Sequence, residues 1–221
     1  MSPFGGKSVR ATLCYALAVR VLIATSNAGK LRDFAGAATA YGIEIAGLPN
    51  FSQLPEVIED GLTFEANARK KAEQYSLHAP GEVVLADDSG LEVDALDGAP
   101  GVHSARYASL GTGLDGNASD EANNARLLNE LMGKPAEERA AQFVCFLAAA
   151  RDGQTLAMFS GVARGVLLEN ARGPHGFGYD PLFFFPELNN TFAELTPQEK
   201  AEVSHRGAAF RKFLEWQYKT T

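Results

Sequence analysis

The first regular pattern along the chain is a strand, a polar turn and a helix in direct succession. Residues 19–24 are apolar and rich in β-branched side chains, which predicts a strand. Residues 25–30 are a polar turn, and residues 31–41 carry apolar positions at helical spacing until Gly42. Strand–loop–helix units of this kind favour an α/β fold with its ligand at the carboxyl end of the strand.

The same alternation of helical and strand-like patterns continues along the chain. Asp152-Gly153 predicts a hairpin turn between two long strands, and Thr196-Pro197-Gln198-Glu199 has the form of a capping box that begins a helix. A glycine-rich stretch over residues 97–117 predicts irregular structure. Further helices are predicted over residues 63–77, 119–132 and 207–218, and further strands over residues 43–48, 82–86, 91–93, 140–150 and 155–168.

The organisation is that of one domain over residues 20–221, because no repeat, low-complexity linker or break in composition divides the chain. Residues 1–19 stand apart from it. They pair two early cations with an apolar run, but that run is short and no small-residue cleavage site follows, which argues against an export signal. We expect an irregular N-terminal extension or a start codon assigned too far upstream.

Composition narrows the partners more than it narrows the fold. The chain has 221 residues, 46% of them hydrophobic and 21% charged, and a formal net charge of -7. Binding to nucleic acid is not expected, because contact with a phosphate backbone needs a basic surface. No apolar run is long enough for a membrane-spanning helix. Cys14 and Cys145 lie in apolar runs and resemble buried thiols, which agrees with a reducing cytoplasm.

Residues 25–30 form the first stretch that predicts chemistry. They combine hydroxyls, an amide, a glycine and a lysine at the start of a helix, where backbone N–H groups favour phosphate. They do not form a P-loop, since Ala24 and Leu31 stand where that motif needs glycine and serine or threonine. A solvated polar turn is the alternative. The predicted phosphate contacts are Thr25, Ser26, Asn27, Ala28, Gly29 and Lys30.

A pair of adjacent acids, Asp87 and Asp88, follows a predicted strand and is costly to bury without a metal or hydrogen bonds. On an extended strand the two side chains point in opposite directions, so one can face Mg²⁺ while the other faces a water or a lysine. A polar turn between two strands is the competing interpretation. Glu59 lies in an acidic loop before the next helix and is a further candidate metal ligand, although by itself it is also typical of an exposed loop acid. Lys71 shares a helix face with Asn67, from which it could reach phosphate.

Two later loops suit a purine pocket. Residues 173–181 offer glycines that let backbone approach a ligand, aromatic rings that can stack on a base, and an acid. An aromatic turn packed on the core is the alternative, above all for Tyr179. Residues 204–207 add an arginine, which can donate to phosphate or to base oxygens, and a histidine, which can donate to a ring oxygen. The start of a surface helix is the alternative. The pocket residues expected here are Phe177, Gly178, Tyr179, Asp180, Lys200, His205 and Arg206.

Six motifs occur in one order and together resemble the inosine triphosphate pyrophosphatase family, which includes dITP/XTP pyrophosphatases. The match spans about residues 21–216. The motifs are Thr-Ser-Asn-x-Gly-Lys at 25–30, Gly-Leu-Thr-Phe-x-x-Asn-Ala at 61–68, Ala-Asp-Asp-Ser-Gly-Leu-x-Val-Asp at 86–94 with Gly-Ala-Pro-Gly at 98–101, Ser-Ala-Arg-Tyr at 104–107, Gly-Phe-Gly-Tyr-Asp-Pro-Leu-Phe at 176–183 and Ser-His-Arg-Gly at 204–207. Residues 1–19 and His175 depart from the family pattern.

The resemblance implies a homodimeric α/β fold, with a long mixed sheet and two lobes around a central cleft. It implies Mg²⁺-dependent hydrolysis of dITP, ITP and XTP to the monophosphate and pyrophosphate, which cleanses the nucleotide pool. Asp88 then resembles the general base, and Ser89 joins the triphosphate contacts. Glu59 and Asp87 or Asp88 resemble the metal ligands. Two alternatives stay open: a module that binds nucleotides without hydrolysis, and a pyrophosphatase of modified pyrimidine triphosphates.

Overall fold

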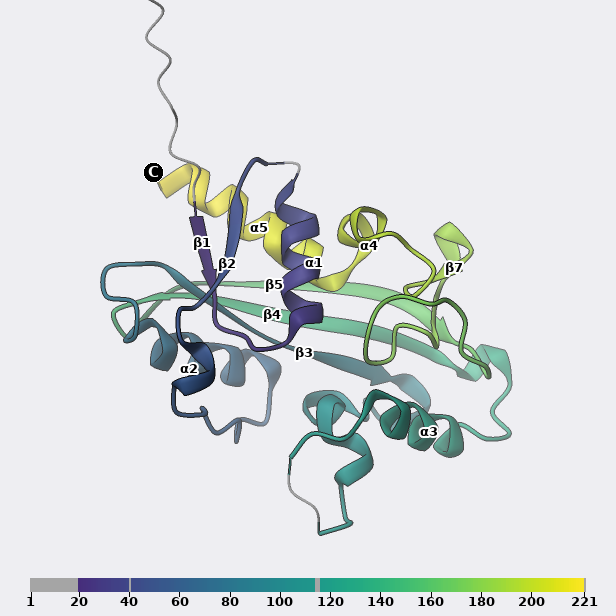
Figure 1. Ribbon diagram of the computed structural model, residues 1–221. Coiled ribbons are helices and arrows are strands. Elements are labelled where there is room, and N and C mark those ends of the chain that lie inside the picture. Colours follow the sequence, from purple (N-terminus) through teal and green to yellow (C-terminus); the bar gives the residue numbers. More distant parts are fainter. Residues whose placement is uncertain (1–19, 40, 114–115, 221) are drawn as a thin grey trace, which may run out of the picture.

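A seven-stranded mixed sheet organises the chain in the computed structural model, which describes residues 20–39, 41–113 and 116–220 (Figure 1). Its order is β2-β1-β3-β4-β5-β6-β7. β2, β1 and β3 run parallel, and every later pair is antiparallel. The strands are β1 (Arg20–Ile23), β2 (Glu44–Gly47), β3 (Val84–Val93), β4 (Ala140–Arg151), β5 (Gln154–Leu167), β6 (Phe183–Phe185) and β7 (Asn190–Thr191).

Helices cover both faces of this sheet. Phe34 of α1 and Phe210 of α5 pack in one cluster with Ile23 of β1, while Ala68 and Ala72 of α2 pack in the cluster on the opposite face. No helix in the described part of the chain is long and apolar enough to cross a membrane. The helices are α1 (Ala28–Thr39), α2 (Phe64–Ser76), α3 (Asp120–Glu130), α4 (Pro197–Val203) and α5 (His205–Thr220), with 3-10 turns at Phe51–Gln53, Asp94–Leu96, Gly101–Ser109, Ala136–Glu138 and Pro186–Leu188.

The core has two separate regions, which define two lobes, and β4 runs through both of them. Ala141 and Phe143 pack with α3 and with residues 179–195 at one end. Farther along the same strand, Cys145 and its alternate neighbours pack beneath α1 and α5, and Ala148 packs beneath α2. The predicted mixed sheet and two-lobed arrangement are therefore confirmed, and the long strands β3–β5 join the lobes.

Local signals gave most elements correctly. Side chains of Thr63, Ser119 and Thr196 cap α2, α3 and α4, and the last of these forms the predicted capping box. Asp152-Gly153 makes the predicted hairpin between β4 and β5. Residues 1–19, which include Cys14, lie outside the described residues. Cys145 is buried as predicted.

Several boundaries differ from prediction. The acids at 87 and 88 do not sit in a turn, because β3 is one uninterrupted strand paired with β4 throughout. α1 begins at Ala28 rather than residue 31, and α5 begins at His205 rather than residue 207. The stretch expected to be irregular contains the 3-10 helix Gly101–Ser109. β6 and β7 were not predicted, since β6 is a short apolar run without alternation and β7 consists of only two polar residues.

Candidate active site

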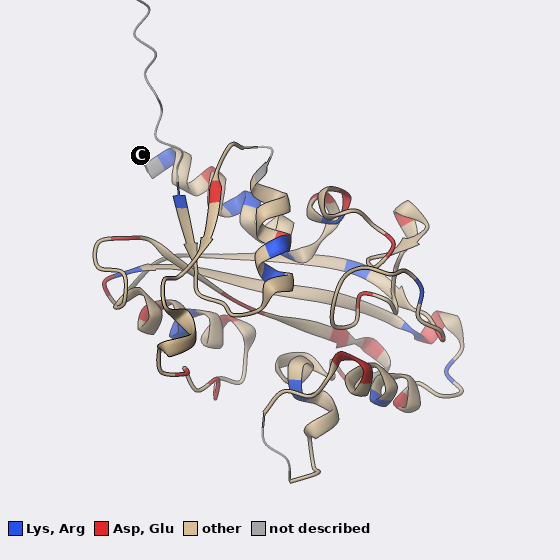
Figure 2. Ribbon diagram, viewed as in Figure 1, with Lys and Arg blue, Asp and Glu red and all other residues tan. Residues whose placement is uncertain are grey.

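The turn after β1 is shaped by its own side chains and begins α1. The Asn27 carboxamide oxygen accepts hydrogen bonds from the backbone N–H groups of Gly29 (2.8 Å) and Lys30 (3.1 Å), which caps the helix. The Thr25 hydroxyl accepts one from the Asn27 N–H at 3.1 Å. Figure 2 shows basic positions along α1 in a chain that is acidic overall. The loop therefore places Lys30 at the positive end of the α1 dipole, while its own side chains already accept from the N–H groups of Asn27, Gly29 and Lys30.

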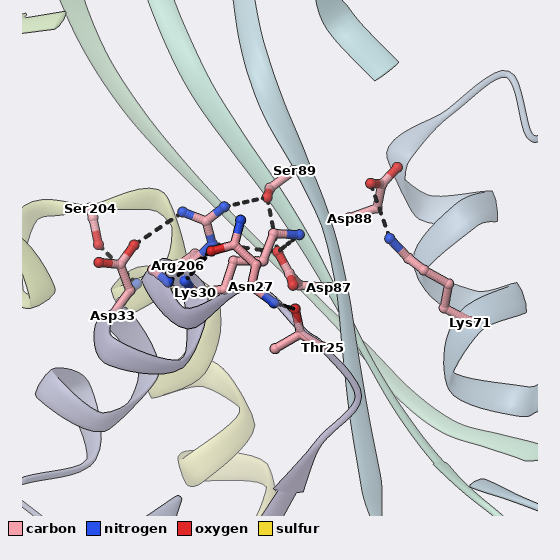
Figure 3. Close-up of polar contacts among 12 residues, drawn as sticks. Thr25, Asn27, Lys30, Asp33, Lys71, Asp87, Asp88, Ser89, Ser204 and Arg206 are labelled. Atoms are coloured by element: carbon pink, nitrogen blue, oxygen red, sulfur yellow. Dashed lines mark hydrogen bonds and ion pairs between the residues drawn. The ribbon is translucent and has the colours of Figure 1, made fainter. Parts of the chain in front are cut away.

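Asp87 and Asp88 lie on opposite faces of β3, as the extended backbone requires (Figure 3). Asp87 points toward α1 and the start of α5, and Asp88 points toward α2. Both are buried, with 3% and 7% of their surface exposed. Their strand pairs here with residues 146–147 of β4, beside the point where the two lobes meet. One dipeptide thus serves two different environments.

The environment of Asp87 is cationic. Its Oδ2 lies 3.0 Å from Lys30 Nζ and 3.4 Å from Arg206 Nε, and it accepts a hydrogen bond from the Ser89 hydroxyl at 2.9 Å. Burial by itself raises the pKa of Asp87. The charges of Lys30 and Arg206 outweigh burial and hold that pKa well below its usual range. Asp87 is therefore a permanent anion that positions the cations around it.

The environment of Asp88 is mixed. Lys71 Nζ lies 3.2 Å from Asp88 Oδ1 and 3.2 Å from Glu59 Oε1, and the Asn67 amide donates to Asp88 Oδ2 at 3.1 Å. Burial raises the pKa of Asp88 above its ordinary value, although the charge of Lys71 opposes the rise, and the nearby Glu59 carboxylate adds to it. A carboxylate with a raised pKa suits proton transfer near neutral pH better than an ordinary one.

Asn67 ties these groups to the loop that carries Glu59. Its oxygen accepts from the Gly61 N–H at 2.8 Å, while its nitrogen faces Asp88. The residue is 1% exposed, so a buried amide is satisfied on both sides. Its place on the same helix face as Lys71 was predicted, but its contact with Asp88 was not, because helical spacing alone says nothing of the strand opposite.

The base-pocket candidates form a second layer beside Asp87. Lys200 Nζ lies 2.6 Å from Asp180 Oδ2 and 3.2 Å from Asp33 Oδ1, and Asp180 Oδ2 also accepts from the Phe177 N–H at 2.9 Å. The Phe177 ring lies over two cations, 4.8 Å from Lys200 Nζ and 5.1 Å from the Arg206 guanidinium carbon. The loop over residues 173–180 is thus held by the ion pair of Asp180 with Lys200 and by the cations that lie against the Phe177 ring.

Two of the base-pocket candidates, Tyr179 and His205, are almost fully buried. The Tyr179 hydroxyl donates to the Ser104 carbonyl at 2.8 Å, and its ring packs in the core beside α3, so the core interpretation describes most of this side chain. His205 stacks on Phe143 at 4.8 Å, and neither of its nitrogens has a partner among the described residues. Burial lowers the pKa of His205 well below its usual value, so the imidazole is neutral.

A cleft of about 780 Å³ joins the two layers. Lys200 lies behind Asp180 rather than on the cleft wall, and Ala28 and Gly29 form the first turn of α1 beneath Phe177. The cleft is lined by the following predicted site residues: Thr25, Ser26, Asn27, Lys30, Glu59, Lys71, Asp87, Asp88, Ser89, Phe177, Gly178, Tyr179, Asp180, His205 and Arg206.

The predicted metal ligands are divided by the strand. Glu59 and Asp88 meet at Lys71, whereas Asp87 faces away toward Lys30. Among the described residues, no three His, Cys, Asp or Glu side chains gather as a metal site of their own. Two carboxylates on one side of a cleft still fit Mg²⁺, which takes few protein oxygens and completes its shell with water and substrate phosphate.

Sequence reasoning missed two charged residues of the site. Asp33 lies one helical turn after Lys30 and accepts from Arg206 Nη1 at 3.1 Å while it pairs with Lys200. Its i, i+3 spacing from Lys30 was the available signal. Arg106, inside one of the ordered motifs, lines the cleft and has no ion-pair partner in the described ranges.

An open mixed sheet with helices on both faces and a polar cleft lined by both cations and acids defines an α/β protein with a small-molecule site. The model of the Ham1 family matches residues 21–216. The chain therefore belongs to the Ham1 family.

Individual relatives agree over most of the chain. A dITP/XTP pyrophosphatase of Geobacter sulfurreducens is 50% identical over 201 residues, which are 90% of this chain and 98% of that protein. One of Acidobacterium capsulatum is 48% identical over 200 residues, 90% and 98% of the two chains. The Ham1 protein structure of Staphylococcus aureus matches with a TM-score of 0.74 at 38% identity, over 91% of this chain and all 100% of that one.

Proposed function

We propose that this chain is an enzyme that hydrolyses non-standard purine nucleoside triphosphates, dITP, ITP and XTP, to the monophosphate and pyrophosphate. The observation that carries the proposal is the Asp87-Asp88 pair, which faces cations on one side of β3 and a partly neutralised carboxylate site on the other. Relatives named dITP/XTP pyrophosphatase support the choice of substrate.

Asp88 is the general base of this proposal. Asn67 and Lys71 bind its two oxygens, so the carboxylate is held in a fixed orientation on the wall of the cleft, where it can accept a proton from water. Asp87 has the opposite role, because its low pKa keeps it charged and it holds Lys30 and Arg206 in place. Two adjacent aspartates thus divide the work of proton transfer and cation positioning.

Mg²⁺ is the cofactor of this proposal, held by Glu59 and Asp88. Both carboxylates already share one cation, Lys71, at 3.2 Å, so this side of the cleft carries the negative charge that a divalent ion needs. The bound ion would supply charge to the bridging phosphate oxygens and lower the pKa of a coordinated water. Lys30 and Lys71 bind the remaining phosphate charge, and the positive end of the α1 dipole beside Lys30 favours it.

Base choice falls to the layer around Phe177. The neutral His205 imidazole has one N–H to give and no partner among the described residues, so it can donate to a purine 6-oxo group. An adenine presents an amine at that position and leaves the imidazole without its bond. Arg206 is already occupied by Asp33, Asp87 and Ser89, which assigns it to positioning more than to free base contact.

A nucleotide panel tests the proposal. Purified chain is incubated with ITP, XTP, dITP, ATP and 5-methyl-UTP in Mg²⁺, and pyrophosphate and single phosphate are measured separately. We expect pyrophosphate from the first three and much slower release from ATP. Single phosphate as the product would refute the bond assignment. Binding without turnover would identify a sensing module, and preference for the pyrimidine would change the substrate class.

The enzyme is proposed to act as a homodimer in the cytoplasm, where the nucleotide pool is kept free of deaminated purines. An unpaired sheet edge supports the dimer. In the described residues β5 pairs with β6 only at Val166 and Leu167, so its outer edge over residues 154–165 has no strand partner. Lys212 donates to the Ser160 carbonyl of this strand, but Leu156 and Val162 are exposed apolar side chains, and strand edges without a strand partner favour association.

A further inference from the structure

Two hydrogen bonds join α3 to Gly178, in the loop that carries Phe177, and we call this pair of bonds the grip. The Gly178 N–H donates to Asp120 Oδ2 at 2.6 Å, and the Gly178 carbonyl accepts from the Asn124 amide at 2.9 Å. Asp120 and Asn124 are four positions apart, so they lie on one face of α3. Gly178 has a φ of 60°, a left-handed conformation that presents both of its polar groups to the helix at little steric cost.

The grip holds the loop at Gly178, between residues that are held by other contacts. On one side of Gly178, Tyr179 is anchored in the core and Asp180 binds the Phe177 N–H. On the other side, the Phe177 ring reaches the neighbouring lobe and packs so closely on Gly29 of α1 that no Cβ fits between them. The α3 contacts therefore lie between Tyr179, which is anchored in the core, and Phe177, whose ring reaches across the cleft to α1.

Asn124 itself is placed by this contact. Its carboxamide oxygen is buried and has no partner among the described residues, and the nitrogen binds Gly178. A half-satisfied buried amide costs stability, so the bond to Gly178 is the interaction that this side chain contributes. Asn124 lies outside the lining of the cleft, whereas Asp120 is part of it, so Asn124 is the residue whose effect on a nucleotide must pass through the loop.

We propose that Asp120 and Asn124 are positioning residues for the nucleobase, which hold Gly178 so that the Phe177 ring stays over Lys200 and Arg206. This inference rests on the proposed function for its substrate, a 6-oxo purine nucleotide. Without the grip the loop adopts its nucleotide-binding conformation for only part of the time, and the apparent affinity for the nucleotide falls in proportion to that fraction. The phosphate side of the cleft, with Asp88 and Lys71, stays unchanged.

Four variants test the grip. Asp120→Ala and Asn124→Leu each remove one hydrogen bond, and Asp120→Asn keeps an acceptor oxygen at the same place. Glu121→Ala is the matched control, because it removes a carboxylate from the same first turn of α3 that has no contact with Gly178 in the described ranges. Thermal unfolding of each variant verifies that it folds.

The first readout is amide hydrogen exchange of the segment 173–182. Asp120→Ala and Asn124→Leu are expected to exchange about tenfold faster there than the parent, and Glu121→Ala as slowly as the parent. Unchanged exchange would overturn the proposal. This measurement needs no substrate, so it judges the grip even if the nucleotide panel refutes the proposed function.

The second readout is steady-state hydrolysis of ITP and ATP by the active parent and its variants. Asp120→Ala and Asn124→Leu are expected to raise KM for ITP about tenfold, with little change in kcat and a smaller preference for ITP over ATP. Asp120→Asn should recover most of the parent's KM. Faster exchange with an unchanged KM and preference would overturn the positioning role, while the parent's own pyrophosphate release would still support the proposed function.

Discussion

At the scale of single residues, Asp88 is set apart from Asp87 by what faces each of them. Asn67 and Lys71 bind its two oxygens, and its pKa is raised, whereas the pKa of Asp87 is depressed by cations. The chemical difference between two identical side chains therefore arises from the opposite faces of one strand. The sequence could predict that they point apart, but not which partners they meet.

Removal of the base should abolish most turnover. Asp88→Asn keeps the shape of the side chain but cannot accept a proton, so we expect kcat for ITP to fall by about 10²–10⁴. The measurement is pyrophosphate release at saturating ITP and Mg²⁺. Asp60→Asn is the control, since Asp60 is an exposed acid that pairs only with Lys70 among the described residues. Near-normal turnover of Asp88→Asn would remove Asp88 from this role.

His205 should make folding sensitive to acid. Burial lowers the pKa of His205 in the folded chain, whereas in the unfolded chain it titrates near its ordinary value of about 6.5. The unfolded state thus binds the proton first, and stability present above that pH is lost as pH falls toward the folded pKa, by at most about 1.4 kcal/mol per pH unit. Denaturant unfolding at pH 7 and pH 5.5 should show a smaller loss for His205→Gln. Equal losses would contradict a neutral His205.

At the scale of elements, the first turn of α1 is coupled to loop 173–180 through Gly29. A Cβ at this position would overlap the Phe177 ring. Gly29 is inside the helix, where alanine is intrinsically favoured by about 1 kcal/mol. Helical preference and the site therefore oppose each other at this residue.

Gly29→Ala should reveal that conflict. We expect KM for ITP to rise about tenfold, because the displaced ring leaves its place over the cations, with thermal stability little changed. Steady-state kinetics and thermal unfolding of the same preparation check both halves. Gly36→Ala is not a matched control, since its Cβ would meet the Pro197 carbonyl at 3.0 Å. Gly47→Ala is suitable, because a Cβ there would meet nothing within 4 Å. A normal KM for Gly29→Ala would exclude the coupling.

Arg139 joins two elements without a carboxylate partner among the described residues. Its guanidinium donates to the carbonyls of Leu131 after α3 and of Leu167 and Leu168 at the end of β5, at 2.7 to 3.0 Å. The residue is 3% exposed. A buried charge that satisfies three backbone carbonyls acts as a clasp between the helix and the strand.

Arg139→Leu should destabilise the lobe that contains α3. Three carbonyls would lose their donor, and we expect the free energy of unfolding to fall by about 2–4 kcal/mol. Urea denaturation measures the change. Lys134→Leu removes an exposed cation of the same segment and should cost little. A loss for Arg139→Leu no larger than for Lys134→Leu would contradict the clasp.

At the scale of the whole molecule, sequence reasoning succeeded where the signal was local. The capping box at Thr196 predicted the start of α4, and the hairpin signal at Asp152-Gly153 predicted the pairing of β4 with β5. It predicted strand on both sides of Asp87 and Asp88 but not that β3 is continuous through them, because two acids in a row are also typical of a turn. Their burial depends on partners as distant as Arg206, 119 positions away, which no local pattern contains.

The unpaired edge of β5 leads to a prediction about assembly. If two copies associate there, sedimentation velocity at micromolar concentration should give twice the chain mass of 23.6 kDa. Val162→Lys should shift the protein toward the monomer, because charge on an edge strand opposes pairing. Leu188→Lys changes an exposed residue elsewhere and should leave the mass unchanged. A monomeric parent would refute the dimer.

The unbroken strand β3 has a consequence for how such an enzyme can diversify. The dipeptide at 87–88 is part of a paired strand between two cores, so its geometry is inherited with the fold itself. The segments around Phe177 and His205 are carried instead by a loop and a helix start. Substitutions there can change which nucleotide is accepted while the broken bond stays the same. Proteins with this fold can therefore change their substrate while they keep the same reaction.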